Sequence, residues 1–193
     1  MRTASITRTT KETDIAIEIA LDTELNTEIS TGIGFFDHML TALSMHSGIS
    51  MKIKANGDLY VDGHHTAEDV GIVLGQCFAQ VLKDKSSITR YGSAYIPMDE
   101  ALGFASLDIS NRPFLVFDCD FKNEKIGDFE TCLFEEFFRA FAFNAGITLH
   151  LRAIYGNNDH HKAEAIFKAC AHALKAAVAK NTNSQPLSTK GVI

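Results

Sequence analysis

The sequence contains one pattern twice, and this internal repeat constrains the fold more than any other feature. Each copy has two adjacent histidines and a glutamate at the start of a segment with helical apolar spacing: His64-His65-Thr66-Ala67-Glu68 and His160-His161-Lys162-Ala163-Glu164. Upstream, Gly48-Ile49-Ser50-Met51 matches Gly146-Ile147-Thr148-Leu149, and the segments before them align His38 with Glu136. Because the two copies keep the same phase, we predict two fused, similar halves.

The order of patterns within each half indicates an α+β fold. Residues 14–21 alternate apolar and smaller or polar side chains, as in a half-buried strand, and further strands are predicted at 95–98, 104–109, 115–121 and 147–153. Helices are predicted at 35–47, 64–83, 129–145 and 160–180. We therefore expect each half to be a β-sheet with two helices packed on one face, a ferredoxin/S5-like repeat. The halves are assigned to residues 1–90 and 91–180, followed by a tail at 181–193.

Composition limits the environment and the partners. The 193 residues are 46% hydrophobic, yet they contain no run of about 18 apolar residues, so we expect no membrane span and a cytoplasmic location. A net charge of -6 gives no basic surface for nucleic acid. Because a sheet with helices on one face leaves its other face exposed, the halves are expected to share a core or to bury surface in a homo-oligomer.

The repeated motifs have the spacing of metal ligands. Residues three or four apart share one face of a helix, so an imidazole and a carboxylate can converge within one turn. A single copy could be a helix cap, but two copies at equivalent positions favour metal binding. The candidate ligands are His38, His64, His65, Glu68, Glu136, His160, His161 and Glu164. Such a set could form two sites that suit Mn, Fe, Co or Zn. Adjacent histidines would serve different ions, in one subunit or in different subunits.

Motifs along essentially the whole chain resemble one enzyme family. They are Arg8-x-x-x-Glu12-Thr13, the run from Gly32 to Leu40, the run from His64 to Gly71, Arg90-Tyr91-Gly92, the run from Met98 to Leu102, the run from Asp108 to Pro113, Asn158-Asp159-His160-His161 and Ser188-Thr189-Lys190-Gly191. Together they resemble the imidazoleglycerol-phosphate dehydratase family of histidine biosynthesis. The chain differs from many members at Gly63, often Asp, and at Glu136, often His. Gly63 lacks the side chain that would make a contact behind the metal ligands.

The resemblance implies an activity and an assembly. The expected reaction is the Mn-dependent removal of water from D-erythro-1-(imidazol-4-yl)glycerol 3-phosphate, giving 3-(imidazol-4-yl)-2-oxopropyl phosphate. The carbon that must lose a proton has no neighbouring carbonyl, so the imidazole ring has to take up the electrons. The family also implies about two Mn²⁺ ions per subunit at subunit interfaces and cage-like homo-oligomers of about twenty-four copies.

Individual roles follow from the same resemblance. Glu12 is expected to bind the substrate and to transfer the proton, with Glu68 and Glu164 as further catalytic candidates. The donors expected around the substrate phosphate are Arg90, Arg112, Lys168, Ser188 and Lys190. Without the resemblance, Arg90 and Lys190 would be interpreted as solvated surface charges.

Two other functions fit the repeated motifs. A dinuclear metallohydrolase would use paired ions to activate water against a phosphate ester. A metal-storage or metal-sensing protein would bind ions without catalysis, and it would not need the set of arginines and lysines expected at the phosphate.

Overall fold

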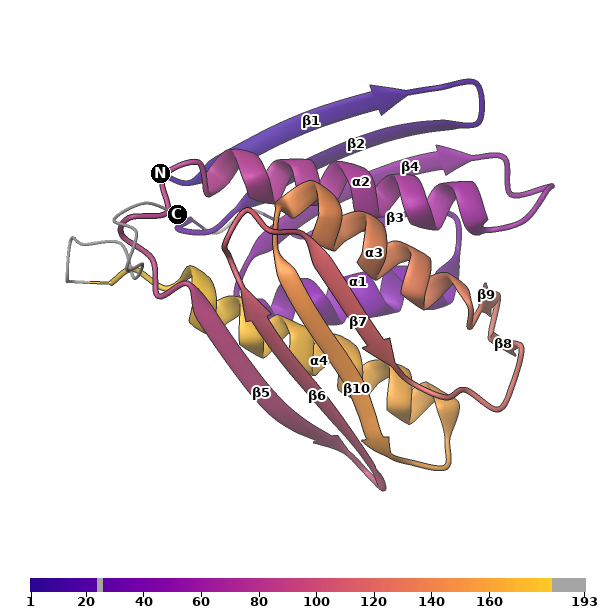
Figure 1. Ribbon diagram of the computed structural model, residues 1–193. Helices are drawn as coiled ribbons and strands as arrows, with labels where there is room; N and C mark the ends of the chain where they lie inside the picture. Colours follow the sequence, from indigo (N-terminus) through magenta and orange to yellow (C-terminus); the bar gives the residue numbers. More distant parts are fainter. Residues whose placement is uncertain (24–25, 182–193) are drawn as a thin grey trace.

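The computed structural model describes residues 1–23 and 26–181, and it contains two four-stranded sheets with the same topology. The first sheet has the order β1-β2-β4-β3, with β1 Thr3–Thr9, β2 Thr13–Ala20, β3 Glu28–Ser30 and β4 Ser50–Gly57. The second has the order β5-β6-β10-β7, with β5 Tyr91–Met98, β6 Ala101–Asp108, β7 Phe114–Asp118 and β10 Thr148–Tyr155. In each sheet the strand at the end of the given order, β3 or β7, pairs in parallel with its neighbour, and the other neighbouring strands pair antiparallel (Figure 1). The predicted duplication of an α+β unit is confirmed.

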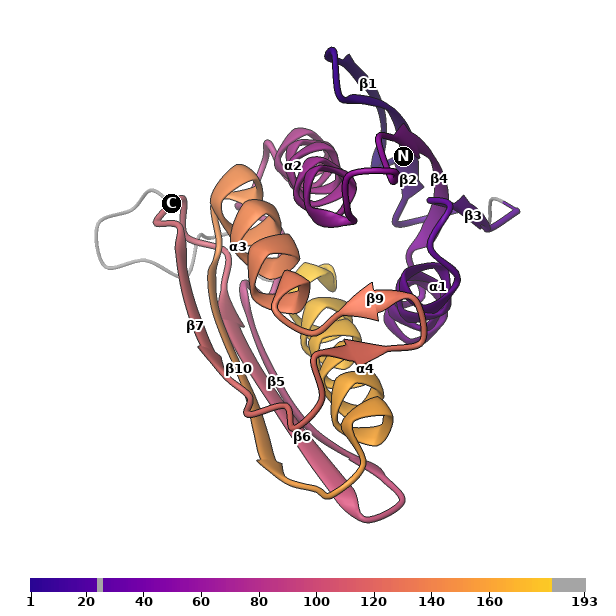
Figure 2. The same ribbon diagram turned by 90° about the vertical axis from the view of Figure 1, so that its right-hand side faces the viewer.

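Four helices lie between the two sheets: α1 Gly34–Ser47, α2 His64–Val81, α3 Leu133–Ala145 and α4 Asp159–Val178 (Figure 2). Helix α2 packs against β1 and β2 of the first sheet, and α4 packs against β5 and β6 of the second. Across the middle, α2 meets α3 and α1 meets α4. One buried apolar cluster therefore runs through both halves, which confirms the shared core. No helix among the described residues is both long enough and apolar enough to cross a bilayer.

Local sequence explains how the elements begin and end. In β2, Ile15, Ile17 and Ile19 are buried in the core, while Asp14, Ala16 and Glu18 are exposed or half-buried, which is the alternation expected of a half-buried strand. Helices α1 and α3 each end at a glycine in the left-handed conformation, with φ of 69° at Gly48 and 68° at Gly146. A residue without Cβ adopts this conformation at no steric cost, so both helices stop at the predicted positions.

Helices α2 and α3 approach closely because α2 carries two glycines on the facing side. A Cβ atom at Gly71 would lie 2.6 Å from the carbonyl oxygen of Phe137, and one at Gly75 would lie 2.6 Å from that of Phe141. Both distances are far below an ordinary van der Waals contact. The spacing Gly71-x-x-x-Gly75 is therefore a helix-packing feature.

The second half contains a hairpin that our helix prediction missed. We predicted a helix from residue 129, but Phe129–Glu130 form β9 and pair with β8, Lys125–Ile126, so that α3 begins at Leu133. Gly127, with φ of 61°, makes the tight turn. Phe129 is fully buried and stacks on Phe36 of α1 at a ring separation of 5.0 Å. The hairpin thus joins the second half to the helix that carries His38.

Candidate metal centre

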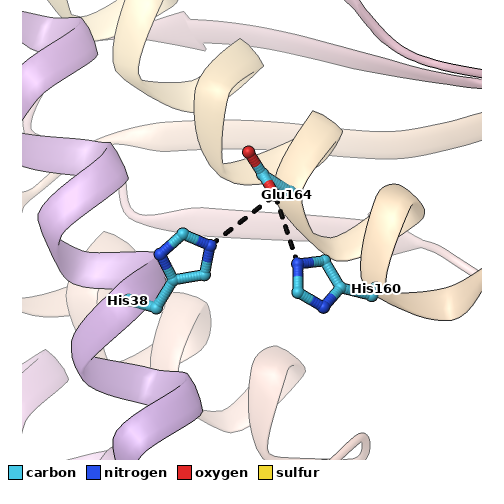
Figure 3. Close-up of side chains that lie close together, drawn as sticks. All are labelled: His38, His160 and Glu164. Carbon is cyan, nitrogen blue, oxygen red and sulfur yellow. Dashed lines mark hydrogen bonds and ion pairs between the residues drawn. The ribbon is translucent and has the colours of Figure 1, made fainter.

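Three of the predicted ligands converge where α1 crosses the start of α4. Glu164 Oε2 lies 3.7 Å from His38 Nε2 and 3.3 Å from His160 Nε2 (Figure 3). One ligand atom from each residue lies within 4.8 Å of the others, which is close enough for a single metal ion to contact all three. Phe35, one turn before His38, packs edge-on against the His160 ring at 5.1 Å and limits its rotation. We call His38, His160 and Glu164 the ligand triad.

Glu164 is the anionic member of the triad. Its side chain is only 11% exposed, and this burial acts to raise its pKa, but a hydrogen bond and the positive charge of Lys168 lower the pKa below the usual value. Lys168 Nζ lies 2.6 Å from Glu164 Oε1, so the other oxygen, Oε2, remains directed at the two imidazoles. A fixed carboxylate beside two imidazole nitrogens is a donor set that suits Mn, Fe, Co or Zn.

A surface hollow of about 340 Å³ opens beside the ligand triad. Its lining includes His38, Thr41, His46, Glu164 and Lys168. A larger hollow of about 610 Å³ lies on the outer face of the first sheet, among residues of β2, β3 and β4. The smaller hollow is the relevant one, because it alone of these two is lined by predicted ligands.

The first motif has the same local geometry as the second. The rings of His64 and His65 lie 6.2 Å apart at 86°, and those of His160 and His161 lie 6.2 Å apart at 80°. His64 Nε2 lies 3.9 Å from Glu68 Oε2, one helical turn away. The two histidines of each pair therefore point in different directions, as expected from their adjacency.

The second histidine of each motif contacts carboxylates. His65 Nδ1 lies 3.1 Å from Asp58 Oδ2, and this hydrogen bond raises the pKa of His65. His161 Nδ1 lies 2.7 Å from Glu100 Oε2; the contact raises the pKa of His161 and helps to lower the pKa of Glu100 to about 2. Glu12 faces the other side of the His65 ring, with Oε1 3.9 Å from Nε2.

Glu136 lies apart from the ligand triad. It is half-buried on α3, and the one group of described residues with ligand atoms at metal-binding distance consists of His38, His160 and Glu164. His64, His65, Glu68 and His161 are also outside that group.

The arginines expected at the phosphate lie far from the ligand triad within one chain. Arg90 donates its backbone N–H to the carbonyl of Ala177, near the end of α4, whereas His160 is in the first turn of that helix. At 1.5 Å per residue the intervening helix spans about 25 Å. The Arg90 guanidinium is buried and binds Asp108 at 2.7 Å, so it is not the solvated surface charge that its residue type alone would suggest. Arg112 is 67% exposed and also contacts Asp108, at 3.3 Å.

Sequence reasoning missed several residues around the motifs, and it assigned others that lie outside the described residues. Asp58, Asp99 and Glu100 contact the motif histidines. Asp58 was not singled out, and Asp99 and Glu100 were quoted only within a motif, without a role. Glu100 could have been found, because it precedes the second strand of its hairpin as Glu12 does in the first half. Ser188, Lys190 and the tail predicted to bind phosphate lie beyond the part of the chain that the structure describes.

Comparison with known proteins identifies the family to which the chain belongs. Residues 31–174 match the family model for imidazoleglycerol-phosphate dehydratase. The chain is 58% identical to the imidazoleglycerol-phosphate dehydratase of Clostridium acetobutylicum, over 100% of this chain and 98% of the relative, and 56% identical to that of Listeria monocytogenes over the whole of both. The crystal structure of the Staphylococcus aureus enzyme superposes with a TM-score of 0.85 at 45% identity, covering 93% of this chain and 99% of the other. The chain therefore belongs to the imidazoleglycerol-phosphate dehydratase family and is an enzyme of the hydro-lyase class.

Proposed function

We propose that the chain removes water from D-erythro-1-(imidazol-4-yl)glycerol 3-phosphate in histidine biosynthesis, giving 3-(imidazol-4-yl)-2-oxopropyl phosphate in a Mn²⁺-dependent reaction. The observation that carries the proposal is the ligand triad, which joins one half's His38 to the other half's His160 and Glu164. The relatives are named for this dehydration.

The donor chemistry fits about two Mn²⁺ ions per subunit. The triad supplies two imidazoles and one carboxylate, and His64, His65, Glu68, Glu136 and His161 are the further ligands we propose. When bound, the ions would act as Lewis acids and stabilise negative charge that develops on the imidazole ring of the substrate. Lys168 keeps Glu164 ionised and correctly turned for this task.

The remaining residues handle the proton and the phosphate. Glu12 is 56% exposed and faces His65, so its carboxylate is free to take the proton from the substrate carbon. Glu68 and Glu164 are the alternative groups for proton transfer. Arg112 presents an exposed guanidinium to the phosphate, and Arg90, held by Asp108, sits beside it. Lys168, Ser188 and Lys190 complete the proposed set.

We further propose that the active enzyme is a homo-oligomer, of about twenty-four subunits, with each site built from more than one chain. The length of α4 supports this, because it separates the ligand triad from Arg90 and Arg112 by about 25 Å within a chain. A small substrate cannot span that distance, whereas a neighbouring subunit can supply the missing end.

The test is to strip the protein of metal with a chelator, add Mn²⁺ in steps and measure product formation. We expect activity to rise until about two ions are bound per chain, and to be lost in His160→Ala. The matched control is His172→Ala, which alters a histidine on the same helix that packs against His46 instead. Metal uptake without product would overturn the dehydratase proposal. Hydrolysis of a generic phosphoester would then favour a metallohydrolase, and inertness would favour metal storage or sensing.

A further inference from the structure

Glu12 and Glu100 occupy equivalent positions in the two halves. Each immediately precedes the second strand of the hairpin that opens its half, β2 at Thr13 and β6 at Ala101. Both hairpin tips reach the second histidine of the motif in their own half. Because their positions are equivalent, we expect Glu12 and Glu100 to make equivalent contacts with these histidines.

The two glutamates nevertheless meet opposite sides of the imidazole. Glu100 approaches Nδ1 of His161 at 2.7 Å, whereas Glu12 approaches Nε2 of His65 at 3.9 Å. In the first half the Nδ1 position is taken by Asp58, whose two oxygens lie 3.2 and 3.1 Å from His65 Nδ1. Each histidine thus has one carboxylate at hydrogen-bond distance from Nδ1, supplied by a different element in each half.

Glu100 is held in place at both of its oxygens. Oε1 accepts hydrogen bonds from the backbone N–H groups of Asn157 and Asn158, at 2.9 and 2.8 Å, which leaves Oε2 for His161. Asn158 is itself the N-cap of α4, where its side chain accepts from the backbone N–H of His160. The carboxylate is therefore fixed relative to the helix turn that carries the motif.

A carboxylate at Nδ1 determines what the other ring nitrogen can do. An imidazole that donates its Nδ1–H has a lone pair on Nε2, which is the atom available to a metal ion. The hydrogen bond also fixes the rotation of the ring. On the Nε2 side of His161 lies Asp99, at 3.6 Å and 70% exposed, so that side is open.

We propose that Glu100 and Asp58 are positioning residues of the metal centre, which accept the Nδ1–H of His161 and of His65 and so present Nε2 of each ring to a metal ion. The inference rests on the proposed function, since it takes both histidines as ligands. The two glutamates at equivalent positions therefore have different roles: Glu100 orients a ligand, whereas Glu12 stays free to act on the substrate.

The decisive variant is Glu100→Gln, because it keeps the size of the side chain. The N–H groups of Asn157 and Asn158 need an acceptor, so the amide oxygen must face them and the NH₂ group must face His161. That group donates to Nδ1, which moves the ring proton to Nε2 and blocks the metal-binding atom. The matched control is Asp99→Asn, which removes the same charge beside the same ring but on its Nε2 side.

The measurement is Mn²⁺ binding to the metal-stripped full chain, followed by the electron paramagnetic resonance signal of free Mn²⁺. We expect Glu100→Gln and Asp58→Asn each to weaken binding by about 10- to 100-fold, and Asp99→Asn to weaken it by less than about threefold. Glu100→Asp, which keeps an acceptor, should recover part of the affinity. Circular dichroism establishes that each variant is folded before it is compared.

The outcomes separate the positioning role from the proposed function. Equal weakening in Glu100→Gln and Asp99→Asn would overturn the inference, because charge alone would then explain the effect. Wild-type affinity in both Glu100→Gln and Asp58→Asn would overturn it as well, while leaving the metal-dependent function intact. A wild-type chain that binds no Mn²⁺ would overturn the proposed function and this inference with it.

Discussion

Asp128 of the second half caps the helix that begins at Gly34 of the first half. Its Oδ2 accepts the backbone N–H of Gly34 at 2.7 Å and its Oδ1 accepts that of Phe35 at 3.0 Å. Ile33, the N-cap residue of α1, makes no side-chain cap, so the carboxylate that satisfies the helix start comes from the hairpin between β8 and β9. The first turn of the helix carrying His38 is therefore anchored by the other half of the chain.

Asp128→Ala is expected to lower the free energy of unfolding by about 1 kcal/mol, the typical cost of a lost N-cap. Urea denaturation at a fixed chain concentration measures this. Asp128→Asn keeps an oxygen that can accept a hydrogen bond, so it should lower the free energy of unfolding by less. An equal decrease in the two variants would contradict the capping role. The same displacement of α1 should weaken Mn²⁺ binding through His38.

Gly75→Ala is expected to destabilise the chain by about 1–3 kcal/mol. The added Cβ would meet the carbonyl oxygen of Phe141 at 2.6 Å and would force α2 and α3 apart. In an open helix the same change would stabilise by up to about 1 kcal/mol. The sign of the change in stability, measured by thermal or urea unfolding, therefore shows whether α2 and α3 pack closely at Gly75. The control is Gln76→Ala, at the neighbouring half-exposed position, which should change stability by less than about 0.5 kcal/mol.

Arg112→Gln is expected to raise KM about tenfold, the loss of one charge-assisted contact to phosphate, without changing Mn²⁺ affinity. Steady-state kinetics combined with a metal titration would separate these two effects. Arg139→Gln is the control, since Arg139 makes an exposed pair with Glu135 on α3. An unchanged KM would remove Arg112 from the phosphate site.

Arg90→Gln should also destabilise the fold, because it leaves the partly buried Asp108 without its 2.7 Å partner.

Asp22 is expected to contribute to stability at neutral pH but not in acid. Hydrogen bonds from Arg2 hold the pKa of Asp22 well below its usual range, and Arg2 also binds the carbonyl of Val178 at the end of α4. A folded-state pKa below the unfolded value of about 3.9 stabilises the fold above that pH. The contribution is then lost as the pH falls through the folded-state pKa.

Asp22→Asn should therefore cost about 1 kcal/mol at pH 7, and its difference from the wild type should shrink below about pH 4. Urea denaturation across this range provides the measurement. Asp118→Asn removes a carboxylate with the same 2.7 Å arginine contact, but that pair is 55% and 60% exposed and should matter less. A cost for Asp22→Asn that persists unchanged into acid would show that the ion pair is not its origin.

Much of the fold could be predicted because the sequence contains the same order of strand and helix patterns in both halves. The alternation in β2 and the ends of α1 and α3, directly before Gly48 and Gly146, agree with the predicted elements. The hairpin of β8 and β9 could not be predicted in the same way, since the first half has no counterpart between β3 and α1. Its apolar Phe129 also fits a helical pattern, and only the turn at Gly127 and the packing on Phe36 decide against it.

The site was less predictable than the fold. Motif spacing identified His160 and Glu164 as neighbours on one helix face, and the repeat pointed to His38, but the crossing of α1 over α4 that joins them depends on packing between distant segments. The burial of Arg90 is equally non-local, because it arises from Asp108 and the end of α4. The roles assigned to Glu136 and to the first motif stay predictions, since these residues lie outside the ligand triad.

The shared core between the two sheets also determines which surfaces a half-length chain would expose. The faces of α1 and α2 that pack on α4 and α3 would be open to water in a half-length chain. Such a chain would need a second copy of itself to cover them, and the matching topology of the halves supplies the complementary surface. The contacts of α1 with α4 and of α2 with α3 therefore do within one polypeptide what a dimer interface would do between two half-length chains.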